Sequence, residues 1–141
     1  MRGRRDDEGT VLVLVLGFTL LLVLMVGVVI NVSAAALARR SVASAADGAA
    51  VAAAQALDSD RLYAEGLPDG RLPLDPADAA RRVGDYAAQT AQPGLSLSVR
   101  VDGSTATVVA VREVRLPFSR LVGLQPLRVE ATARARAPVA P

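Results

Sequence analysis

The chain has 141 residues, a formal net charge of +2, and neither cysteine nor histidine. The lack of both residue types excludes thiol nucleophiles, disulfides, Cys/His zinc sites and imidazole acid–base catalysis. Arginine supplies all 16 basic residues, and these alternate with Asp and Glu too evenly to form the basic stripe of a nucleic-acid-binding surface. We therefore expect no nucleic-acid partner, no cofactor and no metal.

Residues 10–30 form an uninterrupted apolar run, in which 16 of the 21 residues are Leu, Ile, Val or Phe. A helix of this length reaches about 30 Å, the thickness of the hydrocarbon core of a bilayer. The run predicts a transmembrane helix, so the lipid bilayer is an expected partner of the chain. A short basic tail, here residues 1–9, ahead of a first apolar segment is typical of an uncleaved signal anchor. This places the tail in the cytoplasm and the rest of the chain outside it.

A cleaved signal peptide is the alternative interpretation of the same run. Small residues at A-x-A spacing follow it, between Ser33 and Ala38. The run is longer than the roughly 7–15 residues of a signal h-region, which favours the anchor.

An alanine-rich segment continues from the apolar run. Residues 31–57 hold 13 alanines and no proline, so intrinsic propensity predicts one helix over residues 10–57. The side chains of this segment are small, and Gly48 is its single glycine. They predict a packing surface for another helix. Asp47 would set the register through a partner Arg or a backbone amide; otherwise it is a solvated charge on a strong helix former. Asn31 either hydrogen-bonds to a neighbouring helix or marks where the helix meets water.

Residues 58–74 hold Pro68, Asp69-Gly70 and Pro73, which predict a linker with turns. Asp75 followed by Pro76 predicts the start of a second helix, which runs to about residue 90. The helical spacing of its apolar stripe favours packing on one face. That stripe consists of Ala79, Ala80, Val83, Tyr86, Ala87 and Thr90.

The hydrophobic period then changes to two, which predicts strands. Residues 95–102 alternate strictly, Asp102-Gly103 indicates a hairpin, and residues 105–114 and 127–136 form the second and third strands. The fold class is therefore α+β: a long N-terminal transmembrane helix continuing into an Ala-rich helix, then a small extracytoplasmic domain over residues 75–136. That domain consists of one helix and a three-stranded antiparallel sheet. Residues 137–141 are expected to be disordered.

Scattered carboxylates are the remaining candidates for catalysis. Asp58, Asp60, Asp69 and Asp75 lie at a helix end or in turns, and such a polar linker does not supply the environment that acid–base work needs. Phosphate-binding, nucleophile and metal-ligand motifs are also missing. The sequence predicts a protein that is not an enzyme, with no catalytic residue.

The N-terminal third resembles a known family. A charged leader ending in Gly9, an anchor from Thr10, a polar step at Asn31, then Arg39-Arg40 and the Ala-Ala-Asp47-Gly block look like the N-terminal region of TadE/TadG-like Flp (tight adherence) pilus-assembly proteins. The resemblance covers residues 9–57. It implies a single-pass, non-enzymatic membrane component of a pilus or secretion machine. Its implied partners are other pilus-assembly membrane proteins, pilin helices, or a second copy meeting the Ala-rich helix. The helix-packing candidates are Asn31, Arg40, Asp47 and Gly48.

Two residues depart from the family pattern. The family usually has Asp where this chain has Asn31, and its pseudopilin members carry Glu five residues after a processed Gly, where this chain has Leu14. The second departure disfavours processing between Gly9 and Thr10 and favours an uncleaved, TadG-like anchor. Two alternatives stay open: a processed pseudopilin that begins at Thr10, and a secreted or surface-tethered binding domain unrelated to pili.

Overall fold

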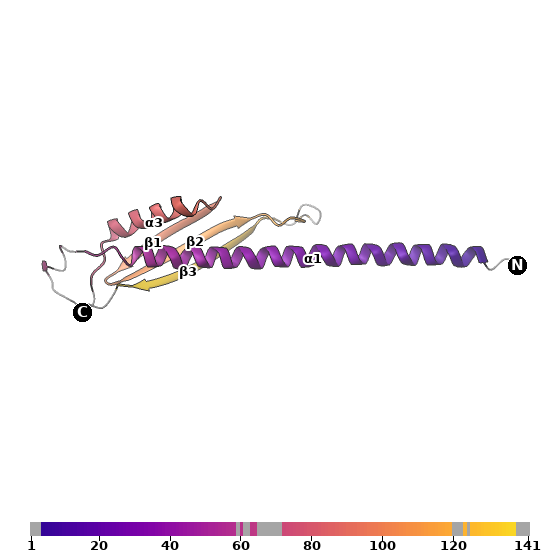
Figure 1. Ribbon diagram of the computed structural model, residues 1–141, viewed down its shortest axis with the longest axis horizontal. Helices are drawn as coiled ribbons and strands as arrows, with labels where there is room; N and C mark the ends of the chain where they lie inside the picture. Colours follow the sequence, from indigo (N-terminus) through magenta and orange to yellow (C-terminus); the bar gives the residue numbers. More distant parts are fainter. Residues whose placement is uncertain are drawn as a thin grey trace.

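The computed structural model describes residues 4–58, 60, 63–64, 72–119, 123 and 125–137, with side chains from residue 9 onward. Within these residues the named elements are the helices α1 (Arg4–Ala53) and α3 (Pro76–Thr90) and the strands β1 (Leu95–Asp102), β2 (Thr105–Val114) and β3 (Leu127–Arg136). Figure 1 shows α1 as a rod whose N-terminal half projects from a domain that the other elements build around its C-terminal half. The predicted α+β class is confirmed.

Helix α1 ends at Ala53, four residues before the predicted end at residue 57. Alanine propensity alone favours continuation. The chain instead turns back, because Leu57 forms a bridge with Leu74 and Ala56 accepts a hydrogen bond from the Asp75 N–H at 2.9 Å. Pairing with a segment distant in sequence therefore overrides local propensity at this end.

The sheet has the strand order β1-β2-β3 and is antiparallel throughout. The predicted alternation is confirmed, since burial alternates residue by residue along β1 and β3. Val99 pairs with Val108, and Val108 with Ala133, so apolar side chains from all three strands share the inner face. Helices α1 and α3 cover that face in Figure 1, with α1 against β2 and β3 and α3 against β1.

The core consists mainly of small side chains, and its largest fully buried members are Leu74, Val42 and Val108. Six of the buried core residues are alanines of α1, which bring the helix axis close to the sheet. These are Ala38, Ala45, Ala46, Ala49, Ala50 and Ala53. The second half of α1 is thus part of the core of the domain, which the sequence placed in residues 75–136.

The predicted hairpin joins β1 to β2 through Gly103 and Ser104. Gly103 has φ +56°, which L-amino acids rarely adopt and which suits glycine in a two-residue hairpin. The carbonyls of both residues accept hydrogen bonds, from the Leu74 N–H at 3.1 Å and the Ala137 N–H at 2.8 Å. Ala137 is also buried, so the first residue of the segment expected to be disordered is ordered. Residues 138–141 lie outside the described residues.

Helix α3 begins as the sequence predicts. The Asp75 side chain caps it by accepting a hydrogen bond from the Ala77 N–H at 2.8 Å, and Pro76 occupies the first turn. Ala79 and Val83 of the predicted stripe are buried, whereas Ala80 is exposed because it is rotated about 100° from Ala79 on the helix. The packing stripe is therefore narrower than expected. Most of the predicted linker, with Pro68, Asp69 and Gly70, lies outside the described residues.

Candidate functional site

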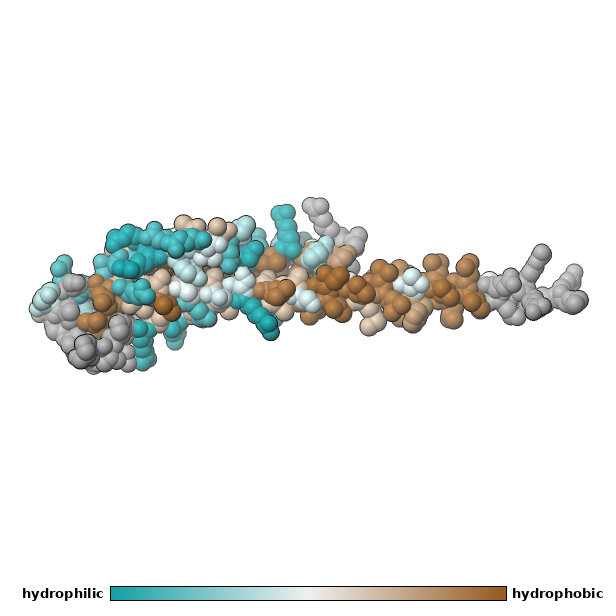
Figure 2. Space-filling model, viewed as in Figure 1, coloured by the Kyte–Doolittle hydropathy of each residue, from teal (hydrophilic) through white to brown (hydrophobic). Residues whose placement is uncertain are grey.

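The N-terminal half of α1 is apolar and exposed. Figure 2 shows hydrophobic side chains along this half, while hydrophilic ones gather over the domain. Leu14 and Leu16 are about as exposed as their neighbours, at 71% and 70%, and mean hydropathy in this stretch reaches 3.1. Within the part of the chain that the structure describes, this is the one helix long and apolar enough to cross a membrane. So large an exposed apolar surface is typical of a contact with a membrane or with another protein.

The alanine-rich half of α1 packs against the chain's own sheet and α3. The sequence predicts a packing surface for another helix here, and Val42, Ala46 and Ala49 are buried at 1% exposure or less within this domain. Small side chains allow a close approach whether the approaching element belongs to the same chain or another. Helical spacing fixes only which residues share a face, so it could not separate these two cases.

Gly48 is the position where α1 meets α3. A Cβ at this position would lie 2.6 Å from Cζ of Tyr86 and closer still to its hydroxyl oxygen. The missing side chain therefore makes room for Tyr86, which is half-buried over the core. Of the predicted helix-packing residues, Gly48 is brought against a helix, and that helix is α3 of the same chain.

Arg40 and Asp47 lie on the outer face of α1. Both side chains are exposed. They are seven residues apart, close to two helical turns, so they share one face at an axial separation of about 10 Å. Leu37 and Val51 are 66% and 56% exposed in the same part of the helix. The face that remains available to a partner is therefore this mixed apolar and charged one.

Asn31 lies where the apolar run ends, and it is half-buried. Its side-chain oxygen accepts a hydrogen bond from the backbone N–H of Phe118 at 3.2 Å. A second polar contact between α1 and the domain joins the Ser41 hydroxyl, as donor, to Oε1 of Gln92 at 3.1 Å. Sequence reasoning missed Phe118. The available signal was the neighbouring Pro117, which by itself indicates only that the preceding strand ends.

Gly9 and Thr10, the candidate processing residues, both lie within α1 and are exposed. The helix passes through them without interruption, and among the residues that the structure describes nothing outside the helix's own backbone lies within 4 Å of a Cβ placed on Gly9. Processing between them stays a prediction.

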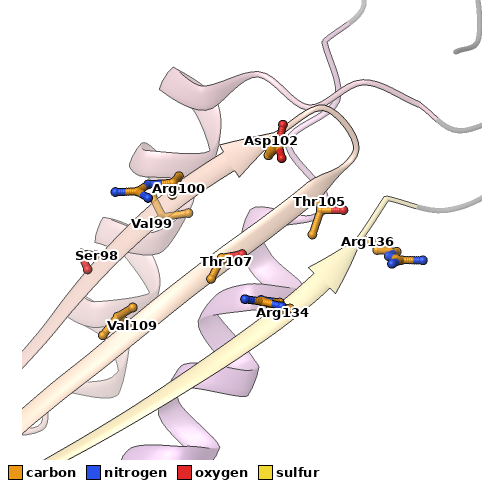
Figure 3. Close-up of a pocket in the computed structure, with 9 residues that line it drawn as sticks. All are labelled: Ser98, Val99, Arg100, Asp102, Thr105, Thr107, Val109, Arg134 and Arg136. Carbon is orange, nitrogen blue, oxygen red and sulfur yellow. The ribbon is translucent and has the colours of Figure 1, made fainter.

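The outer face of the sheet forms a shallow hollow of about 850 Å³ near the hairpin. Figure 3 shows Arg100, Thr107 and Arg134 across the three strands, with Asp102, Thr105 and Arg136 forming the next row. The residues that the structure describes contain no cluster of acidic side chains suited to a metal ion. The hollow holds a single carboxylate among several arginines, so it offers polar contacts and no acid–base pair.

One carboxyl group outside these surfaces has a shifted pKa. The hydrogen bond from Nε of Arg82 at 2.9 Å lowers the pKa of Asp78 below its usual 3.8, with the nearby Arg81 acting in the same direction. Both contacts are within the first turns of α3 and stabilise the ionised carboxylate near the helix N-terminus. The lowered pKa of Asp78 therefore reflects contacts that stabilise α3.

Comparison with known proteins agrees with the resemblance seen in the sequence. Residues 9–56, about a third of the chain, match the Tad family model, described as "Putative Flp pilus-assembly TadE/G-like". No curated protein and no solved structure shows a significant match. The match covers α1 from Gly9 to just past its end, which supports a role related to Flp pilus assembly and a membrane anchor.

Proposed function

We propose that the chain is a single-pass membrane component of a Flp/Tad-type pilus-assembly or secretion system, with a non-enzymatic anchoring or assembly role. The observation that carries this proposal is the coincidence of the family match with α1. The matched residues contain both the exposed apolar half of the helix and the alanine-rich half on which the domain is built. One helix therefore links the bilayer directly to the folded domain.

In this proposal α1 is an uncleaved anchor with its N-terminus in the cytoplasm. The small residues that resemble a signal-peptidase site lie in the middle of α1. Ala38, the last of them, is 8% exposed and belongs to the core. Cleavage there would cut a continuous helix at the edge of the packed domain, which favours retention of the whole segment.

The partner surface in this proposal is the outer face of α1 around Arg40 and Asp47. The alanine face is already covered by the chain's own sheet. A helix of a pilus-assembly protein, a pilin or a second copy would meet the charged face, where an Arg and an Asp two turns apart allow complementary pairing and fix the axial position. Leu37 and Val51 supply apolar area to the same contact.

Topology can be tested with single cysteines, because the chain has none of its own. Ser98→Cys places a thiol on the exposed outer face of β1, and Gly3→Cys places one in the basic tail. A membrane-impermeant maleimide should label Ser98→Cys in cells with a permeabilised outer envelope, and Gly3→Cys only after lysis. The reverse pattern, or labelling of both before lysis, would refute the proposed orientation.

The assembly role requires a separate experiment. Deletion of the gene should abolish or reduce surface pili or pilus-dependent secretion, and the full chain should restore them. A matched variant in which residues 10–30 are replaced by a cleavable signal of another protein should release the domain without restoring assembly. Normal pili in the deletion strain would refute the assembly role while leaving the anchor intact.

A processed pseudopilin is the second candidate, because the family match starts at Gly9 and the helix beyond it projects freely from the domain. Such a subunit would pack its apolar helix against those of its neighbours in a filament. It predicts a mature N-terminus at Thr10, which the mass of the mature chain distinguishes from the anchor.

A further inference from the structure

The chain that follows β2 forms a tight turn over Leu116, Pro117, Phe118 and Ser119. Two hydrogen bonds close it, because the Leu116 carbonyl accepts from the Ser119 N–H at 3.1 Å and from the Ser119 hydroxyl at 2.7 Å. Pro117 occupies the position at which proline is favoured in such turns. Ser119 is buried. The turn is therefore held in one shape by its own contacts.

The turn is hydrogen-bonded to α1 at one position along the helix, Asn31. The Phe118 N–H donates to Asn31, the residue that follows directly on the apolar run. Figure 1 shows the connection after β2 extending along α1 beyond the sheet, toward the N-terminus. Because residues 10–30 match the hydrocarbon thickness of about 30 Å, Asn31 falls at the outer boundary of that layer. The turn falls at the same boundary.

The side chains at this level suit the boundary region of a bilayer. Leu116 and Phe118 line one almost wholly apolar groove with the face of α1 that includes Gly27 and Val28. Phe118 is 37% exposed although it is strongly apolar. The groove is continuous with the membrane-spanning surface of α1, so acyl chains that surround the helix also reach the turn.

Cationic side chains lie just beyond the groove. Arg115 precedes the turn and is exposed. Arg39 and Arg40 are exposed on α1, about 12–14 Å beyond Asn31 at the helical rise per residue. Long arginine side chains extend toward phosphate groups at such positions. The order along the molecule is thus apolar helix, apolar turn and arginines, which matches the order of hydrocarbon, boundary and headgroups.

We propose that the turn at residues 116–119 is a membrane-docking element, which inserts Leu116 and Phe118 into the boundary between headgroups and acyl chains of the outer leaflet. This rests on the proposed membrane span of α1. The domain then rests on the bilayer at two points, α1 and the turn, and cannot rotate freely about the helix axis. A lipid surface is the occupant of the groove.

The chain contains no tryptophan, so one introduced tryptophan reports on a single position. The full chain is reconstituted into vesicles of phosphatidylcholine and phosphatidylglycerol that carry bromine either near the carbonyl end or near the methyl end of the acyl chains. Phe118→Trp tests the turn, and Leu20→Trp marks the middle of the span. Tyr63→Trp, a conservative change at a site 89% exposed, is the reference for a tryptophan in water.

Phe118→Trp should show blue-shifted emission relative to Tyr63→Trp and lose more emission to shallow bromine than to deep bromine. Leu20→Trp should lose more to deep bromine. Combining Asn31→Ala with Phe118→Trp should reduce the quenching of the tryptophan by shallow bromine, because the turn loses its hydrogen bond to α1. Leu116→Trp provides an independent probe in case the first substitution disturbs the turn.

Quenching of Leu20→Trp, with aqueous emission from both turn probes, would overturn the docking proposal alone. Blue-shifted but unquenched turn probes would show that protein, such as a second copy, covers the groove, which also overturns it. An unquenched Leu20→Trp would refute the membrane span itself.

Discussion

The contact between Gly48 and Tyr86 leads to a prediction whose sign depends on the packing of α1 against α3. Replacing a glycine with alanine inside a helix normally stabilises it by about 1 kcal/mol. At Gly48 the new methyl group would lie 2.6 Å from Cζ of Tyr86. Overpacking of this kind costs about 1–3 kcal/mol, so Gly48→Ala should lower the free energy of unfolding by roughly 1 kcal/mol.

A second variant and a control isolate the cause. In a Tyr86→Ala background the obstruction is gone, so Gly48→Ala should stabilise by about 1 kcal/mol. The coupling between the two sites is then roughly 2 kcal/mol, within the range for residues in contact. Gly84→Ala is the matched control, because Gly84 lies inside α3, is exposed and has no atom within 4 Å of the methyl group that the substitution adds. It should stabilise by about 1 kcal/mol in either background.

The assay is thermal unfolding of the full chain in detergent micelles, followed by circular dichroism and calorimetry. For a domain of this size each kcal/mol shifts Tm by roughly 4–8 °C, so the opposite signs of Gly48→Ala and Gly84→Ala are measurable. Equal stabilisation by both substitutions, or no coupling to Tyr86, would refute the packing of α1 against α3.

Three further changes test other parts of the structure. Leu74→Ala should cost about 2–5 kcal/mol in urea unfolding, because Leu74 is fully buried; a cost below about 1 kcal/mol would contradict its place in the core. The lowered pKa of Asp78 adds stability at pH values above 3.8, and this stability is lost as pH falls through the folded-state pKa. In Asp78→Asn, Tm should therefore fall less steeply toward acid pH. An unchanged dependence of Tm on pH would contradict the Arg82 contact. Asp47→Arg and Arg40→Glu should leave Tm unchanged, since both sites are exposed, yet reduce co-purification of pilus-assembly partners; full retention of partners would exclude this face.

Much of the fold follows from local pattern. The two-residue alternation around Val99 and Val129 predicted both outer strands and their inward faces, because a half-buried strand places every second side chain in the core. Asp75 and Pro76 predicted the start of α3, because capping and a fixed φ act within a single turn. These features depend on neighbours in sequence.

The remaining features depend on contacts between distant segments. The end of α1 at Ala53 is set by pairing of Leu57 with Leu74, and neither residue signals the other locally. The alanine-rich face predicted packing against another helix, but its spacing does not say which element covers it. Asn31 stands out in the sequence as a polar step, but its partner Phe118 lies 87 residues away.

The same limit applies to the candidate site. Gly48 stood out as the one glycine in the alanine-rich half of α1, yet only the folded chain shows that it accommodates Tyr86. Arg40 and Asp47 keep the exposure needed for a partner, and their role stays a prediction. The exposure of a charged side chain can be expected from sequence, whereas the partner of a packed residue is known only from the fold.

In the proposed function α1 is retained whole, with its first half in the membrane and its second half in the domain. Intact-mass spectrometry of the chain extracted from bacterial membranes tests this most directly. If α1 is retained whole, the mature chain still contains the residues before Thr10 and is found in the membrane fraction. A mature N-terminus at Thr10 would instead indicate a processed pseudopilin, and one between Ala35 and Arg39 with release of the domain would contradict the anchor.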